Sequence, residues 1–221
     1  MRAAIQVINP NSNRAVTDGI DAALAPLRMA GGPDIHCLTL AEGPPGVVTH
    51  LDVQGVAAPL AALADSLSAQ SSAYVIACYS DPGMHVLRER LKQPVLGIGE
   101  CGLLTALTLG ERFGVIAILD RSIPRHLRTY GAMGVMGRFA GELAIGLDVQ
   151  ELAERDRTLS RMKEVGARLR DERGADVIVM GCAGMAAYRE PLQQALGIAV
   201  VEPTQAAVGM AIARVQLNWG H

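Results

Sequence analysis

Two cysteines occupy matching places in the two halves of this 221-residue chain. Cys78 closes the apolar run of AYVIACYSDPG, and Cys182 closes that of ADVIVMGCAGM. Each run is short and rich in β-branched residues, which predicts a buried strand, and turn residues and a helical stretch follow each one. A thiol at the carboxyl end of such a strand stands where α/β proteins place reactive groups. Two thiols that face each other across a cleft would suit the transfer of a proton from one side of a carbon atom to the other.

The residues after Cys78 predict a helix that begins close to the thiol. Ser80 or Asp81 is expected to cap this helix, with Pro82 at its first position, where a missing N–H costs nothing. The free backbone N–H groups at the helix start are expected to lower the thiol pKa from its usual value of about 8.5 and to hold an oxyanion.

Cys182 has the same setting, next to the small residues Ala183 and Gly184, which let a ligand approach closely. A strand-end cysteine taken alone is more often a small buried side chain than a reactive one. The prediction of a two-thiol site therefore depends on the repetition of the setting.

Polar residues also follow the first strand of each half. Asn11 lies in INPNSN, and Ser122 lies in LDRSIP. Both fit either a helix cap or a ligand contact, because ligands bind at the carboxyl edge of parallel strands. The candidate substrate-binding residues are Asn11, Tyr79, Ser80, Ser122, Ala183 and Gly184.

Short apolar runs alternate with longer amphipathic stretches along the whole chain, which predicts parallel sheets flanked by helices in an α/β fold. The expected strands are Ala3–Asn9, Ile35–Leu40, Ala73–Cys78, Val95–Gly99, Phe113–Leu119, Arg138–Ile145, Asp176–Gly181 and Ile198–Val201. The expected helices are Ser12–Leu27, Val53–Ser68, Gly83–Leu91, Gly102–Leu109, Pro124–Tyr130, Val149–Arg173, Ala186–Leu196 and Thr204–Leu217.

Three pairs of segments match in the same order, at spacings near half the chain. AAIQVINPNS resembles VIAILDRS, AYVIAC resembles ADVIVMGC, and PVLGIGECG resembles IAVVEPTQ. A duplicated unit is expected, with two pseudo-symmetric lobes and the active site between them. Residues 1–97 plus 204–221 would form the first lobe and residues 98–203 the second.

Composition excludes several classes of function. The net charge of −2 comes without a basic patch, which argues against nucleic-acid binding. No run reaches the roughly 18 apolar residues of a spanning helix. The four cysteines lack the spacing of a zinc site, and no dinucleotide or phosphate-binding glycine motif is present.

Cys37, inside a strand, and Cys101, at a turn, are expected to be structural. We expect a cytoplasmic protein without metal or cofactor.

With these segments placed, the chain resembles the aspartate/glutamate/hydantoin racemase superfamily over its whole length. VINPNSN, ACYSDPG, MGCAGM and RSIP are most similar to hydantoin and allantoin racemases. The resemblance implies two α/β lobes, a homo-oligomer, a small-molecule substrate, no cofactor, and Cys78 and Cys182 as the opposed acid and base. Tyr79 and Ser80 stand where amino-acid racemases usually have Asn-Thr, which argues against aspartate or glutamate. Arylmalonate decarboxylases keep only the second cysteine, and because this chain has both, the resemblance argues against that branch.

The resemblance therefore predicts racemisation of a 5-substituted hydantoin or allantoin by proton transfer at C5. The alternatives are maleate cis-trans isomerase or another enzyme of the superfamily, namely an amino-acid racemase or a decarboxylase. A dithiol redox protein and a non-catalytic small-molecule binder are alternatives of another class.

Overall fold

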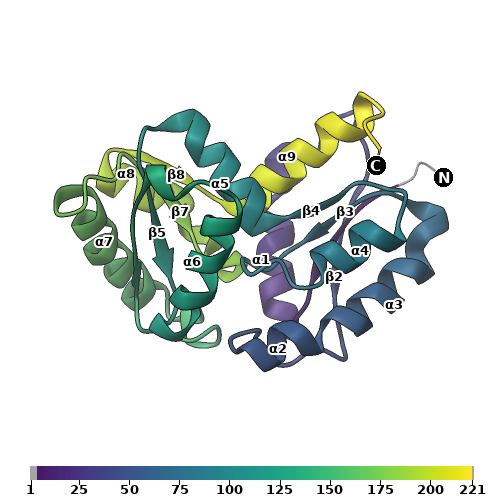
Figure 1. Cartoon of the computed structure of the whole chain (residues 1–221), viewed down its shortest axis with the longest axis horizontal. Helices are drawn as coiled ribbons and strands as arrows, with labels where there is room; N and C mark the ends of the chain where they lie inside the picture. The colour runs from purple at the N-terminus through teal and green to yellow at the C-terminus, as the bar shows by residue number, and fades with distance from the viewer. Residues whose placement is uncertain (1–3, 221) are drawn as a thin grey trace. The chain divides into compact units, whose positions relative to one another are not determined.

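A computed structural model describes residues 4–220, and the chain forms two compact units (Figure 1). The first unit consists of the described residues within Met1–Cys101 and Thr204–His221, and the second is Gly102–Pro203. The chain leaves the first unit within helix α5 (Ile98–Leu109) and returns to it at the start of helix α9 (Pro203–Gln216).

The first unit contains a parallel sheet of four strands in the order β2-β1-β3-β4. Every residue of the central strand β1 is buried, which explains its near-continuous apolar sequence. Val7 of β1 lies opposite Cys37 of β2 and Val75 of β3. The strands are β1 (Ala4–Asn9), β2 (Ile35–Thr39), β3 (Ser71–Ile76) and β4 (Val95–Gly97). Ala3, the expected start of β1, lies outside the described residues.

The second unit repeats this topology with the strand order β6-β5-β7-β8, again all parallel. The three pairs of similar segments fall on β1 and β5, β3 and β7, and β4 and β8, which hold equivalent places in the two sheets. The predicted α/β fold with two similar units is therefore confirmed. The strands are β5 (Phe113–Ala117), β6 (Phe139–Ala144), β7 (Val177–Met180) and β8 (Ala199–Val201).

Helices connect the strands in both units, as is usual between parallel strands. The remaining α-helices are α1 (Arg14–Ala23), α2 (His50–Gly55), α3 (Ala57–Leu67), α4 (Met84–Arg90), α6 (Ile123–Ala132), α7 (Arg155–Asp171) and α8 (Arg189–Leu196). The 3-10 helices are η1 (Ala25–Leu27), η2 (Ser68–Gln70), η3 (Asp120–Ser122), η4 (Met136–Arg138), η5 (Glu151–Ala153) and η6 (Ala183–Tyr188).

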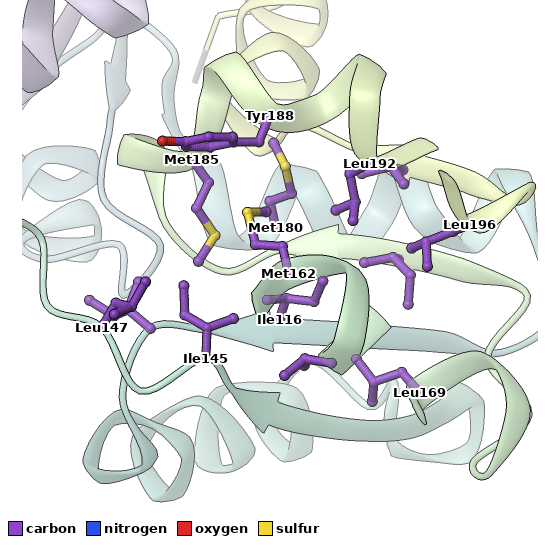
Figure 2. Packing of buried hydrophobic residues seen from close by; sticks show 14 of the residues in the cluster. Ile116, Ile145, Leu147, Met162, Leu169, Met180, Met185, Tyr188, Leu192 and Leu196 are labelled. Atoms are coloured by element: carbon purple, nitrogen blue, oxygen red, sulfur yellow. The ribbon is translucent and has the colours of Figure 1, made fainter. Parts of the chain in front are cut away.

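Each sheet buries its apolar side chains against helices. In the first unit α2, α3 and α4 pack on the face of β1 and β3 that carries Ile8 and Ile76. In the second unit α7 and α8 cover one face, and Figure 2 shows Met180, Met185 and Tyr188 among the Ile and Leu side chains of this core. Helix α6 covers the other face, where the Tyr130 ring lies edge-on to that of Phe113, with ring centres 6.0 Å apart.

Two local expectations were wrong. Helix α4 begins only at Met84 and is preceded by Gly83 in the left-handed conformation, so neither Ser80 nor Asp81 caps it and Pro82 lies outside it. Helix α5 begins at Ile98, four residues earlier than expected, so Cys101 lies inside a helix rather than at a turn. Both differences have one cause, because the Asp81 side chain caps α5 instead of α4.

Candidate functional site

The predicted site residues lie in two groups, one in each unit. Neighbouring strands β1 and β3 carry Asn11 and Cys78 just beyond their carboxyl ends. Neighbouring strands β5 and β7 carry Ser122 and Cys182 in the same way. Because the carboxyl ends of adjacent parallel strands meet at one edge of a sheet, each unit presents a thiol and a polar side chain at that edge. Tyr79 and Ser80 accompany the first group, and Ala183 and Gly184 the second.

Cys78 is a half-buried cysteine that forms no disulfide, at the start of a tight turn. The N–H of Ala77 donates to the Ile8 carbonyl at 2.9 Å, so strand pairing continues up to the thiol. The Asp81 N–H then donates to the Cys78 carbonyl at 2.9 Å, which closes the turn. The Asp81 carboxylate accepts from the N–H groups of Gly99 and Glu100, at 2.8 Å each, in the first turn of α5. A carboxylate from this turn therefore covers the start of α5.

Cys182 is also half-buried and forms no disulfide, and the 3-10 helix η6 begins directly after it. Burial raises the pKa of the Cys182 thiol to about 11, and the charge of Glu202 adds to this rise. A hydrogen bond from the Gly184 N–H lowers the pKa, as expected for a helix start, but burial outweighs it. The expectation of a lowered thiol pKa was therefore wrong for Cys182, which rests as a protonated thiol.

Asn11 is oriented by its neighbours at the end of β1. Its side-chain oxygen accepts from Asn9 Nδ2 at 3.1 Å and from the Asn13 N–H at 2.9 Å. Asn9, which is fully buried, also donates to Thr17 Oγ1 at 3.0 Å. Both acceptor contacts turn the Asn11 oxygen inward, and its Nδ2 group remains as the donor that this side chain can offer. Such a donor suits the carbonyl oxygen of a neutral ligand.

Ser122 is buried at the end of η3, and its Oγ donates to the Leu119 carbonyl at 2.7 Å. The Ser122 N–H donates to the same carbonyl at 3.1 Å. Because its one hydroxyl proton is used within the turn, Ser122 can meet a ligand through oxygen lone pairs only. Asn11 and Ser122 hold equivalent places in the two sheets, but they offer opposite hydrogen-bonding roles.

Comparisons with known proteins identify the family. The profile of the Asp/Glu/Hydantoin racemase family matches residues 5–211. The chain belongs to this family. It is 35% identical to a hydantoin racemase from Rhizobium meliloti over 214 residues, which cover 94% of this chain and 86% of the relative. Its fold is similar to that of an allantoin racemase from Klebsiella pneumoniae, with a TM-score of 0.93 and 30% identity over 99% of this chain and 89% of the other.

A second allantoin racemase structure, from Pseudomonas fluorescens, gives a TM-score of 0.91 at 29% identity and covers 100% of this chain and 93% of that one. The family and these relatives make this chain an isomerase of the racemase type, as the sequence resemblance predicted. Among residues 4–220, no helix is long and apolar enough to cross a membrane.

Glu202 is a buried acidic residue near Cys182 that the sequence analysis did not identify as a candidate site residue. It directly follows β8, next to β7 in the sheet, and only 2% of its surface is exposed. Its charge acts on Cys182. The signal was present, because an acidic residue that ends a buried apolar strand stands at the same sheet edge as the thiol.

The other cysteines and the histidine that the sequence brought into question do not stand at the ends of β3 and β7. Cys37 lies in β2 and Cys101 in α5, and burial raises the pKa of each thiol to about 12. His85 is exposed on α4. Within the described part of the chain, no three His, Cys, Asp or Glu side chains are grouped as a metal site would need.

The resting state of Cys182 leads to a testable prediction. With a pKa of about 11, roughly one thiol in 10⁴ is ionised at pH 7, so alkylation of Cys182 by iodoacetamide should be slow and should rise steadily up to about pH 11. Glu202→Gln removes the nearby negative charge and should shift this profile to lower pH. Mass spectrometry of each cysteine after timed alkylation measures both. A Cys182 profile centred below pH 8 would contradict the prediction.

Proposed function

We propose that this chain racemises a five-membered cyclic ureide, either a 5-substituted hydantoin or allantoin, by moving a proton at C5 between Cys78 and Cys182. One observation carries the proposal: two half-buried thiols, neither of them in a disulfide, follow equivalent strands, β3 and β7, of two sheets with the same strand order. Membership of the racemase family and relatives described as hydantoin and allantoin racemases support the choice of substrate.

In the proposed reaction the Cys78 thiolate removes the proton from C5, and the electron pair of the broken C–H bond passes into an enolate at the C4 carbonyl. The Cys182 thiol then gives its proton to the opposite face of C5. The product enantiomer leaves Cys78 protonated and Cys182 ionised, and the roles exchange for the reverse reaction. The raised pKa of Cys182 supports its role as the acid in the first direction.

Neighbouring groups would bind and orient the ring. Nδ2 of Asn11 is suited to donate to a ring carbonyl, and the Ser122 oxygen is suited to accept from a ring N–H. Backbone N–H groups next to Cys78 and Cys182 would stabilise the enolate oxygen. Tyr79, Ser80, Ala183 and Gly184 would line the same site. The small side chains beside Cys182 would let the ring approach the thiol.

The deciding experiment incubates the purified protein with each enantiomer of allantoin and of a 5-alkyl hydantoin in D₂O. Circular dichroism follows the loss of optical activity, and proton NMR follows replacement of the C5 proton by deuterium. We expect both signals to change, with the faster ring identifying the preferred substituent. Rings that stay optically pure and fully protonated would overturn the proposal, and conversion of maleate to fumarate in a parallel incubation would assign the thiols to an isomerase of alkenes instead.

A further inference from the structure

The turn that carries Cys78 has an unusual backbone. Asp81, its last residue, has a φ of 46°, in the left-handed region of backbone conformation that residues other than glycine rarely adopt. Conformations of this kind are strained and persist only where the surrounding structure holds them. The contacts of Asp81 show what holds this one.

Both oxygens of the Asp81 carboxylate are used at the start of α5. Oδ1 accepts from the Gly99 N–H and Oδ2 from the Glu100 N–H, each at 2.8 Å. These N–H groups belong to the first turn, where a helix supplies no partner of its own. The approach is close, because a Cβ at Gly97 would overlap the Asp81 carboxylate and one at Gly99 would overlap the Tyr79 carbonyl. The carboxylate therefore joins the turn to the helix start at a point of close backbone approach.

The charge state of this carboxylate changes near neutral pH. Removal from water raises the pKa of Asp81 to about 7, against the two N–H donors, which lower it. Two charged side chains face it: Glu100 on α5 raises the pKa and Arg88 on α4 lowers it, and these two form an ion pair at 2.5 Å. Cys101, also on α5, has its own pKa raised to about 12 and stays protonated throughout this range.

We propose that Asp81 is the positioning residue for Cys78: its ionised carboxylate ties the Cys78–Asp81 turn to the start of α5 and so sets the place of the thiol and of the N–H groups beside it. The inference rests on the proposed role of Cys78 as acid and base. Protonation turns one oxygen into a hydroxyl, a poor acceptor for a backbone N–H, so one of the two bonds weakens and the strained turn is released.

The test compares Asp81→Asn with Asp176→Asn. Asparagine keeps the size of the side chain and one acceptor oxygen, so the variant should fold, but its NH₂ group faces an N–H donor. Asp176 is a matched control, since its carboxylate accepts from the consecutive N–H groups of Glu111 and Arg112 at 2.8 and 2.9 Å. It precedes β7, at the end of the strand opposite to Cys182.

In the wild type and in Asp176→Asn, kcat/KM for the preferred ring should rise with pH through a step near pH 7. Asp81→Asn should lack this step and should run roughly 10- to 100-fold below the wild type, the loss expected when a reacting group is misplaced by about 1 Å. A lowered melting temperature in both variants, with kcat/KM and the step unchanged in Asp81→Asn, would show a purely structural cap and overturn the inference.

Two readouts do not depend on racemisation. The alkylation rate of Cys78, measured by mass spectrometry, should differ between Asp81→Asn and the wild type and not between Asp176→Asn and the wild type. In the unmutated protein, the amide proton shifts of Gly99 and Glu100 should titrate together with a midpoint near pH 7. If no ring is racemised, the proposed function is refuted, but the alkylation rate of Cys78 and the amide shifts still test whether Asp81 positions Cys78. Unchanged alkylation of Cys78 and amide shifts that stay constant from pH 5 to 9 would overturn its positioning role.

Discussion

Replacement of either Cys78 or Cys182 by serine is expected to lower kcat for racemisation by roughly 10²- to 10⁴-fold or more, the contribution of a single positioned acid or base. A hydroxyl has nearly the size of a thiol, but it is a far weaker acid, so it neither takes nor gives the C5 proton at neutral pH. The ring should still bind, which leaves KM within a few-fold of the wild-type value. Loss of circular dichroism by an enantiopure ring measures the rate.

The same two variants should show which thiol acts on which face of the substrate. A protein with one working thiol can remove the C5 proton of one enantiomer and return a deuteron to the same face without inverting the carbon. In D₂O, Cys78→Ser and Cys182→Ser should therefore exchange the C5 proton of opposite enantiomers. Cys37→Ser in β2 serves as the control, and it should keep full racemisation. Two active-site variants that racemise at the wild-type rate would refute the two-thiol mechanism.

Gly99→Ala is expected to destabilise the protein, although it adds only one methyl group. Gly99 lies in the first turn of α5, where alanine is normally preferred by roughly 1 kcal/mol. Here the added Cβ would overlap the backbone oxygen of Tyr79 and lie 3.0 Å from Asp81 Oδ2. Because a backbone atom cannot rotate away, the Cys78 turn must shift, and the free energy of unfolding should fall by roughly 1–3 kcal/mol.

A second helical glycine gives the opposite expectation. Gly19 lies inside α1 in the same unit, and a Cβ added there would meet no atom within 4 Å, so Gly19→Ala should raise stability by about 0.5–1 kcal/mol. Thermal denaturation of the two variants measures the contrast, and Gly99→Ala should also lose racemisation beyond its loss of folded protein. Equal melting temperatures and equal activity in both variants would show that the Cys78 turn tolerates displacement.

The sequence by itself determined the order and type of the strands and the family. Each of the eight expected strands has a counterpart within two residues or so at its start, because short apolar runs between turn residues are a local signal of burial in a parallel sheet. The positions of Cys78 and Cys182 at the ends of two such runs followed from the same signal. Repeated segments indicated the second sheet, since equivalent strands bury similar side chains.

Only the tertiary structure decided which helix Asp81 caps. The local sequence favoured α4, which starts nearby, whereas the carboxylate reaches α5, 18 and 19 residues further along the chain. Capping preferences describe neighbours in sequence, but a hydrogen bond forms with whichever donor the packing of β3 and β4 brings close. The same packing moved the start of α5 to Ile98 and placed Cys101 inside it.

The acidity of Cys182 was likewise a tertiary property. Its neighbours in sequence predicted a helix start and a lowered thiol pKa, and the Gly184 N–H does act in that direction. Burial acts more strongly in the other direction, and the charge of Glu202, which comes 20 residues later at the end of β8, adds to it. Desolvation and Coulomb interaction depend on distance in space and on exclusion of water, and a sequence pattern contains neither quantity.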